Sequence, residues 1–218
     1  MPAIIFDFDG VIVNSEPLHE EALLRCAQER GMSFTHEQYM TRLIGLADRD
    51  CLPLLFELNG RRVTPEEHRA FFAQKKRMVH DMIVGGRAEV FPGTLRIIRE
   101  ATVPLAVCSG AIRSEIDLVL RTLKMVNRFR AIVSADDVRH SKPHPEGYEK
   151  AAASVGFDPG ACVAIEDTPT GSRAALAAGL RVIAVGHSLP RGAFPADIAL
   201  YVRSTEELDV PRVLGLVG

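Results

Sequence analysis

The sequence predicts an α/β fold, a doubly wound and mainly parallel sheet with a small all-helical domain inserted after its first strand. Short runs rich in Val and Ile recur along the chain, and helical patterns separate most of them. Apolar runs of this kind are typical of strands buried on both faces, and the helices between them supply the crossovers. One long interval after the first run contains helical patterns only, which indicates the insertion.

The predicted strands of the sheet are residues 3–8, 104–109, 131–135, 162–167 and 181–186. The predicted helices between them are residues 94–101, 112–123, 145–155 and 170–178. Gly156 and Gly179 follow two of these helices, where a residue that tolerates positive φ ends a helix before the next strand.

The interval 15–83 predicts helices of its own. Leu18, Leu23 and Cys26 belong to an apolar stripe at helical spacing that ends before Gly31. Two capping boxes follow, one at 35–38 and one with Pro at its first helical position at 64–67. We therefore expect a sheet core formed by residues 1–14 and 84–218, and a helical domain formed by residues 15–83.

The composition excludes several classes of protein. Of the 218 residues 47% are hydrophobic, and the formal net charge is -2, so nothing favours nucleic acid or a membrane as partner. No apolar run reaches the about 18 residues that cross a bilayer, and the first residues do not form a signal peptide. The four cysteines are far apart, which favours free buried thiols. We expect a cytoplasmic protein that is a monomer or a weak dimer.

Polar side chains follow successive predicted strands, and ligands of open parallel sheets bind at that edge. These residues are Asp7, Asp9, Ser109, Lys142, Glu166 and Asp167, and Gly110 follows Ser109. Crowded carboxylates repel one another unless a cation lies among them, and Mg²⁺ that keeps several waters suits so few carboxylates. A lysine and a hydroxyl beside such a site form a receptor for a phosphoryl group. The sequence therefore predicts a Mg²⁺ and phosphate site.

Four segments resemble the motifs of the haloacid dehalogenase superfamily, in the family's order. They are FDFDGV at 6–11, CSG at 108–110, SKPHP at 141–145 and IEDT at 165–168. The insertion resembles the small helical cap of the superfamily's phosphatase and β-phosphoglucomutase branch. The resemblance spans residues 3–186 and implies a Rossmann-like catalytic core with this cap.

The resemblance also implies roles for the strand-end residues. Asp7 would be the nucleophile that forms an aspartyl-phosphate, and Asp9 would be the general acid and then the base. Mg²⁺ would be bound by the Asp7 side chain, the Asp9 carbonyl and Asp167, with Glu166 as a further or water-mediated ligand. Ser109 and Lys142 would hold the phosphoryl oxygens, with help from the backbone N–H of Gly110.

Substrate choice would depend on the cap and on one residue of the core. His19 matches a histidine of the mutases near the catalytic acid, although a hinge histidine fits equally well. Gly45 and Arg49 lie in a turn that resembles the cap's specificity loop, where the mutases have a lysine at the position of Ile44. For Arg49, and for Arg113 after the Ser109 turn, a solvent-facing side chain is the alternative.

These features favour a Mg²⁺-dependent phosphomonoester phosphatase that acts on a small phosphorylated metabolite, a sugar or polyol phosphate. A phosphohexomutase of the β-phosphoglucomutase type is the main alternative, weakened by the missing lysine. A non-catalytic phospho-receiver module is a remote one, because Asp9 and the insertion argue against it. Asp9 also argues against dehalogenase chemistry, and the absence of lysine before Lys75 argues against phosphonate hydrolysis through a cap Schiff base.

Overall fold

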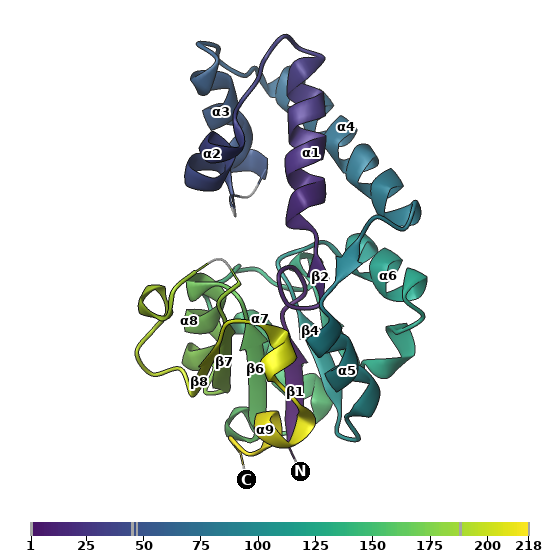
Figure 1. Cartoon of the computed structure of the whole chain (residues 1–218), viewed down its shortest axis with the longest axis vertical. Coiled ribbons are helices and arrows are strands. Elements are labelled where there is room, and N and C mark those ends of the chain that lie inside the picture. The colour runs from purple at the N-terminus through teal and green to yellow at the C-terminus, as the bar shows by residue number, and fades with distance from the viewer. Residues whose placement is uncertain (1, 45, 47, 188, 218) are drawn as a thin grey trace. The chain divides into compact units, whose positions relative to one another are not determined.

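A six-stranded parallel sheet forms the centre of the larger part of the molecule (Figure 1). The structure, a computed structural model, describes residues 2–44, 46, 48–187 and 189–217. The strands of the sheet are β1 (Ala3–Phe6), β4 (Leu105–Cys108), β5 (Ala131–Val133), β6 (Cys162–Glu166), β7 (Arg181–Val185) and β8 (Leu200–Val202). Each predicted run contains one of the first five of these strands, and β8 was not predicted.

The strands lie in the order β5-β4-β1-β6-β7-β8. The chain moves outward from β1 in one direction through β4 and β5, and then returns to the other side of β1 with β6. Ile5 pairs with Ala106 on one side and with Ala164 on the other. The strand order reverses between β1 and β6, and this switch point is where open α/β sheets bind ligands. The predicted doubly wound fold class is confirmed.

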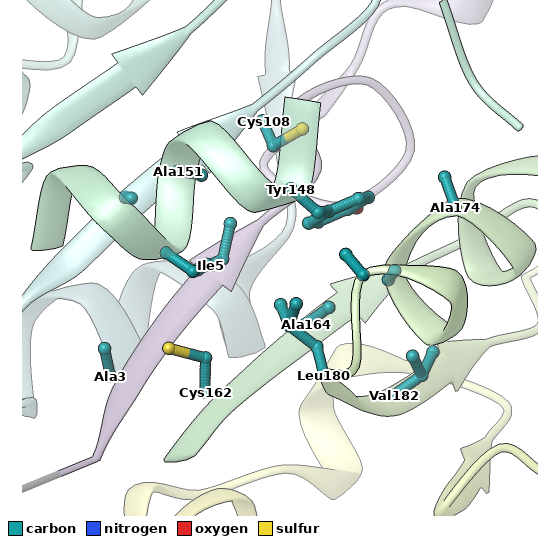
Figure 2. Packing of buried hydrophobic residues seen from close by; sticks show 14 of the residues in the cluster. Ala3, Ile5, Cys108, Tyr148, Ala151, Cys162, Ala164, Ala174, Leu180 and Val182 are labelled. Atoms are coloured by element: carbon teal, nitrogen blue, oxygen red, sulfur yellow. The ribbon is translucent and has the colours of Figure 1, made fainter. Parts of the chain in front are cut away.

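Helices α7 (Glu146–Val155) and α8 (Pro169–Ala177) cover one face of the sheet with small side chains. Figure 2 shows Ala151 and Ala174 of these helices packed over Ile5 and Ala164 of the strands. Alanines on the helices and on the strands let the two layers lie close together. The ring of Tyr148 is much larger than these neighbouring side chains.

The opposite face of the sheet carries the alternate side chains of each strand. On β1 these are Ile4 and Phe6, both fully buried, and the rings of Phe6 and Phe129 form a T-shaped pair with 6.2 Å between their centroids. The remaining α-helices among the described residues of this part are α5 (Pro92–Glu100), α6 (Arg113–Thr122) and α9 (Val210–Leu214).

A second sheet has two strands, one before the helical insertion in the chain and one after it. β2 (Val13–Asn14) pairs antiparallel with β3 (Glu89–Val90), with Val13 opposite Val90. This ribbon was not predicted, because strands of two residues are too short to show an alternating pattern in the sequence.

The smaller unit contains α1 (Glu16–Gln28), α2 (His36–Gln38), a π-helical turn (Tyr39–Leu43), α3 (Asp48–Leu58) and α4 (Pro65–Val84). The predicted stripe of α1 is buried, including Leu18, Leu23 and Cys26. Both predicted capping boxes are present, because Thr35 and Thr64 each accept the backbone N–H three residues ahead. The local signals in the sequence therefore located the helix starts correctly.

The chain divides into two compact units, residues 1–14 with 89–218, and residues 15–88. The expected second boundary, between residues 83 and 84, lies too early. α4 continues through Val84, and Arg87 donates from its backbone to Met82 and from its side chain to Glu21 of α1. These contacts keep residues 85–88 with the helical unit.

Two further expectations concern the whole chain. All four cysteines are free and buried. Within the described residues, no helix has the length and apolar character needed to cross a membrane.

Candidate active site

Asp7 directly follows β1 and lies at the switch point of the sheet. Its backbone N–H donates to the carbonyl of Ile165 on β6 at 2.9 Å, which continues the pairing of the two strands by one residue. The Asp7 side chain is almost completely buried. The carboxylate is therefore fixed beside the end of β6, where Glu166 and Asp167 follow.

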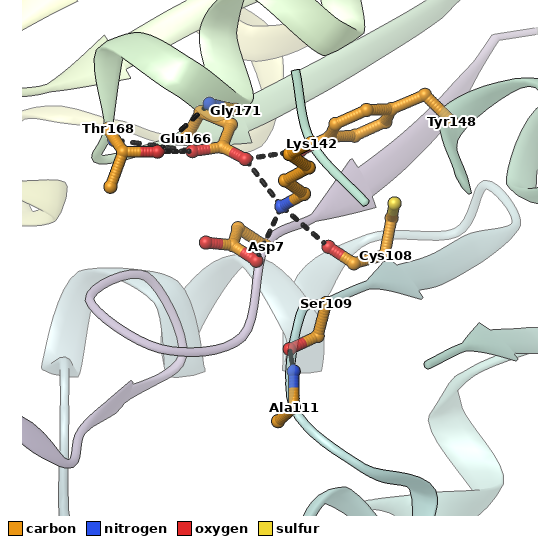
Figure 3. A network of polar contacts seen from close by, with 9 residues as sticks. All are labelled: Asp7, Cys108, Ser109, Ala111, Lys142, Tyr148, Glu166, Thr168 and Gly171. Carbon is orange, nitrogen blue, oxygen red and sulfur yellow. Dashed lines mark hydrogen bonds and ion pairs between the residues drawn. The ribbon is translucent and has the colours of Figure 1, made fainter. Parts of the chain in front are cut away.

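The ammonium group of Lys142 joins three strand ends (Figure 3). Its Nζ donates to Asp7 Oδ1 at 2.8 Å, to Glu166 Oε1 at 2.6 Å and to the carbonyl of Cys108 at 3.1 Å. These three acceptors use all three N–H bonds of the ammonium. Burial disfavours the charged form, but the carboxylates of Asp7 and Glu166 outweigh it and raise the Lys142 pKa well above its ordinary value. Lys142 is therefore a fixed positive charge.

Glu166 is fully buried and both of its carboxylate oxygens are occupied. Oε1 accepts the Lys142 ammonium and the Tyr148 hydroxyl, the latter at 2.8 Å. Oε2 accepts the backbone N–H of Thr168 at 3.2 Å and its hydroxyl at 3.0 Å. Figure 3 shows Thr168 and Lys142 on opposite sides of the carboxylate. Glu166 thus orients its neighbours and has no unused oxygen.

Asp167 differs from Glu166 in this respect. Among the described residues, its Oδ1 is a buried side-chain oxygen for which no hydrogen-bond partner is found. Carboxylate oxygens of Asp7, Glu166 and Asp167 all lie within 4.8 Å of one another. An orphaned oxygen within a group of crowded acids fits a hard divalent cation such as Mg²⁺, with Asp7 and Asp167 supplying oxygens.

The electrostatics of the acids support this fit. Burial and then the charge of Glu166 raise the pKa of Asp7 to about 7, although Lys142 lowers it in part. Burial and the charge of Asp7 raise the pKa of Asp167 well above its ordinary value. The charge of Asp9 also raises the pKa of Asp7 and of Asp167, so the Asp9 carboxylate lies near these two carboxylates. One lysine does not neutralise this many acids, and a bound cation would let them ionise together.

Two glycines make room for the acids. A Cβ on Gly10 would lie 1.9 Å from Asp167 Oδ2, and a Cβ on Gly171 would lie 1.8 Å from Glu166 Oε1. Gly10 also has a φ of +75°, a backbone conformation that side chains disfavour. The turn after Asp9 and the first turn of α8 can therefore approach the carboxylates only because these residues lack side chains.

Ser109 and Gly110 form the turn after β4. The Ser109 N–H donates to Val133 of β5 at 2.9 Å, and its buried hydroxyl accepts the N–H of Ala111 at 2.9 Å (Figure 3). A Cβ on Gly110 would meet nothing within 4 Å. Ser109 directly follows Cys108, whose carbonyl accepts the Lys142 ammonium. The predicted hydroxyl and the ammonium of the predicted lysine therefore both lie at the end of β4.

The predicted substrate-binding residues Arg113, His19, Gly45 and Arg49 stay predictions. Arg113 donates from Nε to Asp117 on its own helix at 3.0 Å, and its side chain is half exposed, as the solvent-facing alternative requires. His19 lies in the first turn of α1 in the helical unit. Gly45 and the side chain of Arg49 lie outside the described residues. The structure thus brings Asp7, Lys142, Glu166 and Asp167 together and does not test the residues of the helical unit.

Sequence reasoning missed the way the Lys142 loop is anchored. His140 and His144, which precede and follow Lys142 in this loop, form with Glu146 a group whose possible ligand atoms lie within 4.8 Å of one another. The Glu146 carboxylate accepts the backbone N–H groups of Arg139 and His140 at 3.1 and 3.0 Å, and the Lys150 ammonium at 2.6 Å. These bonds close the loop on both sides of Lys142. The acid four residues after the lysine and its i,i+4 partner Lys150 were visible in the sequence, but the backbone N–H groups that Glu146 also accepts leave no pattern.

Comparison with known proteins agrees with the motifs and the fold. The family model described as haloacid dehalogenase-like hydrolase matches residues 4–185. The chain is 31% identical to a phosphorylated carbohydrates phosphatase of Thermotoga maritima, over 88% of each chain. It is 30% identical to the fructose-1-phosphate phosphatase YqaB of Escherichia coli, over 84% of this chain and 95% of that one.

A solved structure shows the same fold. CbbY from Rhodobacter sphaeroides in complex with phosphate superposes with a TM-score of 0.83 and 25% identity, covering 95% of this chain and 96% of that chain. The match of the family model over most of the chain carries the assignment. The protein belongs to the haloacid dehalogenase-like hydrolases.

Proposed function

We propose that this protein is a Mg²⁺-dependent phosphomonoester phosphatase that acts on a small phosphorylated carbohydrate through an aspartyl-phosphate on Asp7. The observation that carries the proposal is the placement of Lys142, whose ammonium is held between the nucleophile candidate Asp7 and the buried Glu166. A phosphoryl group bound at Asp7 would meet this fixed charge. The names of the two phosphatase relatives support a carbohydrate phosphate as substrate.

Each step can be assigned to a residue of this chain. An Asp7 oxygen attacks phosphorus, the bond from phosphorus to the ester oxygen breaks, and Asp9 protonates the leaving alcohol. Asp9 then takes a proton from water, whose oxygen attacks the same phosphorus and releases phosphate while restoring Asp7. The Ser109 hydroxyl donates to the phosphoryl oxygens, and the fixed charge of Lys142 beside Asp7 stabilises them during both displacements.

The cation would be held by Asp7, Asp167 and the backbone carbonyl of Asp9. When bound, Mg²⁺ supplies neutralising charge for the phosphoryl oxygens and for the carboxylates around them. Because the carboxylate oxygens of Glu166 are engaged by Lys142, Tyr148 and Thr168, we assign Glu166 to orienting these groups and not to direct coordination.

Phosphate release from a panel of sugar, polyol, nucleotide and glycolate phosphates tests this function. We expect Mg²⁺-dependent hydrolysis with highest kcat/KM on a sugar or polyol phosphate, and loss of hydrolysis on chelation. Preference for a nucleotide or glycolate phosphate would contradict the substrate class. Isomerisation of glucose 1-phosphate in the presence of a bisphosphate primer, without net phosphate release, would favour the mutase alternative.

A further inference from the structure

Tyr148 is a large, fully buried side chain in a layer otherwise formed mainly by small residues. It lies on the face of α7 that carries Ala151, Ala152 and Val155 toward the sheet. α7 approaches the end of β4 closely at this point, because a Cβ on Gly147 would lie 2.9 Å from Cys108 Sγ. The ring of Tyr148 is therefore brought to the strand ends by the packing of α7.

Tyr148 contacts both charged partners of the central ion pair. Its hydroxyl donates to Glu166 Oε1 at 2.8 Å, and the Lys142 ammonium lies 5.1 Å from the centre of its ring. Glu166 Oε1 thus accepts from the hydroxyl and the ammonium together (Figure 3). A hydroxyl bonded to a buried carboxylate gives a strong, charge-assisted hydrogen bond, and the ring face attracts the cation.

The direction of the Lys142 ammonium depends on these contacts. Lysine has a flexible side chain with four rotatable carbon bonds, so its charge is fixed only by the groups around it. The hydroxyl of Tyr148 restricts rotation of the Glu166 carboxylate, and the carboxylate in turn directs Nζ to Asp7. Without the hydroxyl, Glu166 Oε1 keeps its bond from the ammonium, and the carboxylate is held by one donor fewer.

We propose that Tyr148 is a positioning residue, which fixes the Lys142 ammonium toward Asp7 by holding Glu166 Oε1 and by presenting its ring to the cation. The effect on turnover rests on the proposed phosphatase function, whereas the effect on the ammonium itself does not. A variant that removes the hydroxyl and keeps the ring isolates the hydrogen bond.

The test compares Tyr148→Phe with Tyr201→Phe. Tyr201 is a matched control, because its hydroxyl also makes a hydrogen bond, to the carbonyl of Leu189 at 2.9 Å, and because it lies on β8, the edge strand of the sheet next to β7. The first measurement is the ¹H–¹⁵N spectrum of lysine ammonium groups, in which a buried, fully bonded ammonium exchanges slowly and Lys142→Met assigns its signal. The second measurement is steady-state kinetics on the best substrate of the panel.

We expect the Lys142 ammonium signal to persist in wild type and in Tyr201→Phe, and to broaden or vanish in Tyr148→Phe. We expect kcat of Tyr148→Phe to fall about tenfold, the size expected for one hydrogen bond to a charged group, and kcat of Tyr201→Phe to stay within twofold. KM should change by less than kcat, because the ammonium acts mainly when charge develops on the phosphoryl oxygens.

An unchanged ammonium signal in Tyr148→Phe overturns the inference, and so does a lost signal with wild-type kcat. If wild type shows no phosphatase activity, the spectrum alone still decides the positioning role, so the two proposals fail separately. Should Tyr148→Phe not fold, Glu166→Gln weakens the same pairing from the other side, and a wild-type ammonium signal in that variant overturns the inference.

Discussion

Gly171, in the first turn of α8, lies so close to Glu166 that a Cβ there would be 1.8 Å from the carboxylate oxygen Oε1. The same oxygen accepts the Lys142 ammonium and the Tyr148 hydroxyl. The start of α8 therefore packs directly against the ion pair of Lys142 and Glu166. A methyl group at this position displaces a charged group that has no open space around it.

Gly171→Ala should therefore destabilise the protein by about 2 kcal/mol, the cost of overpacking a buried site. Denaturant unfolding followed by circular dichroism measures this difference. Gly192→Ala is the matched control, since a Cβ there meets nothing within 4 Å, and it should change stability by less than about 0.5 kcal/mol. Equal stability of the two variants would show that Glu166 moves aside without cost.

Lys142→Met should lower kcat/KM by about 100- to 1000-fold, because it removes a fixed charge at the phosphoryl site. It should also destabilise the fold, since Asp7 and Glu166 lose their shared buried partner. Phosphate release and denaturant unfolding measure the two effects. Lys124→Met, the same change at an exposed lysine, should leave both quantities near wild type. Turnover of Lys142→Met within fivefold of wild type would exclude the role assigned to the ammonium.

Glu146 predicts a specific dependence of stability on acid. Hydrogen bonds from Lys150 and from the backbone of Arg139 lower the pKa of this carboxyl from 4.5 to about 2. A carboxyl with a lowered pKa in the folded state stabilises the fold fully above its unfolded pKa, and this stabilisation is lost as pH falls from about 4.5 toward 2.

The measurement is the free energy of unfolding of wild type and Glu146→Gln between pH 6 and pH 2. The variant should be less stable at pH 6, and the difference between the two proteins should shrink as the pH falls through this window. A difference that stays constant with pH would show that the charge of Glu146 does not anchor the Lys142 loop. Glu149→Gln, at an exposed position three residues further along α7, is the control and should show little difference at any pH.

Cys108 should be chemically inert despite its position between a strand end and the acids. Burial raises the pKa of its thiol to about 12, so it is protonated at pH 8, and 2% of the residue is exposed. Alkylation with iodoacetamide at pH 8 should leave Cys108 unmodified in the native protein and modify it in denaturant, as peptide mass spectrometry would record. Rapid native alkylation of Cys108 would contradict the packing of α7 against β4.

The sequence predicted two kinds of feature correctly, the acids that follow neighbouring parallel strands and the residues that begin helices. The acids Asp7 and Glu166 follow apolar runs, and the carboxyl ends of neighbouring parallel strands necessarily share an edge, so their meeting was predictable. Thr35 and Thr64 begin helices through bonds to residues three positions away, which a sequence pattern records directly.

The remainder depends on contacts that leave no pattern. Strands β2 and β8 are two and three residues long, too short for an alternation to be seen. Glu146 accepts backbone N–H groups of the Lys142 loop, which no sequence pattern records. The role of Tyr148 depends on how closely α7 packs on β4, which follows from side-chain volumes across the layer. The residues that support Lys142 were therefore visible in the sequence only as neighbours of a motif.

The central claim is that Asp7 carries the phosphoryl group during turnover. Acid quench of the enzyme with its best substrate, followed by borohydride reduction, converts an aspartyl-phosphate to homoserine, which tryptic mass spectrometry locates. Homoserine is expected at Asp7, in the peptide that ends at Arg25, and it should be missing in Asp7→Asn. In Asp9→Asn its yield should rise if the substitution slows hydrolysis of the aspartyl-phosphate more than its formation. Turnover without a modified Asp7, or a phosphoryl group trapped on another residue, would contradict it.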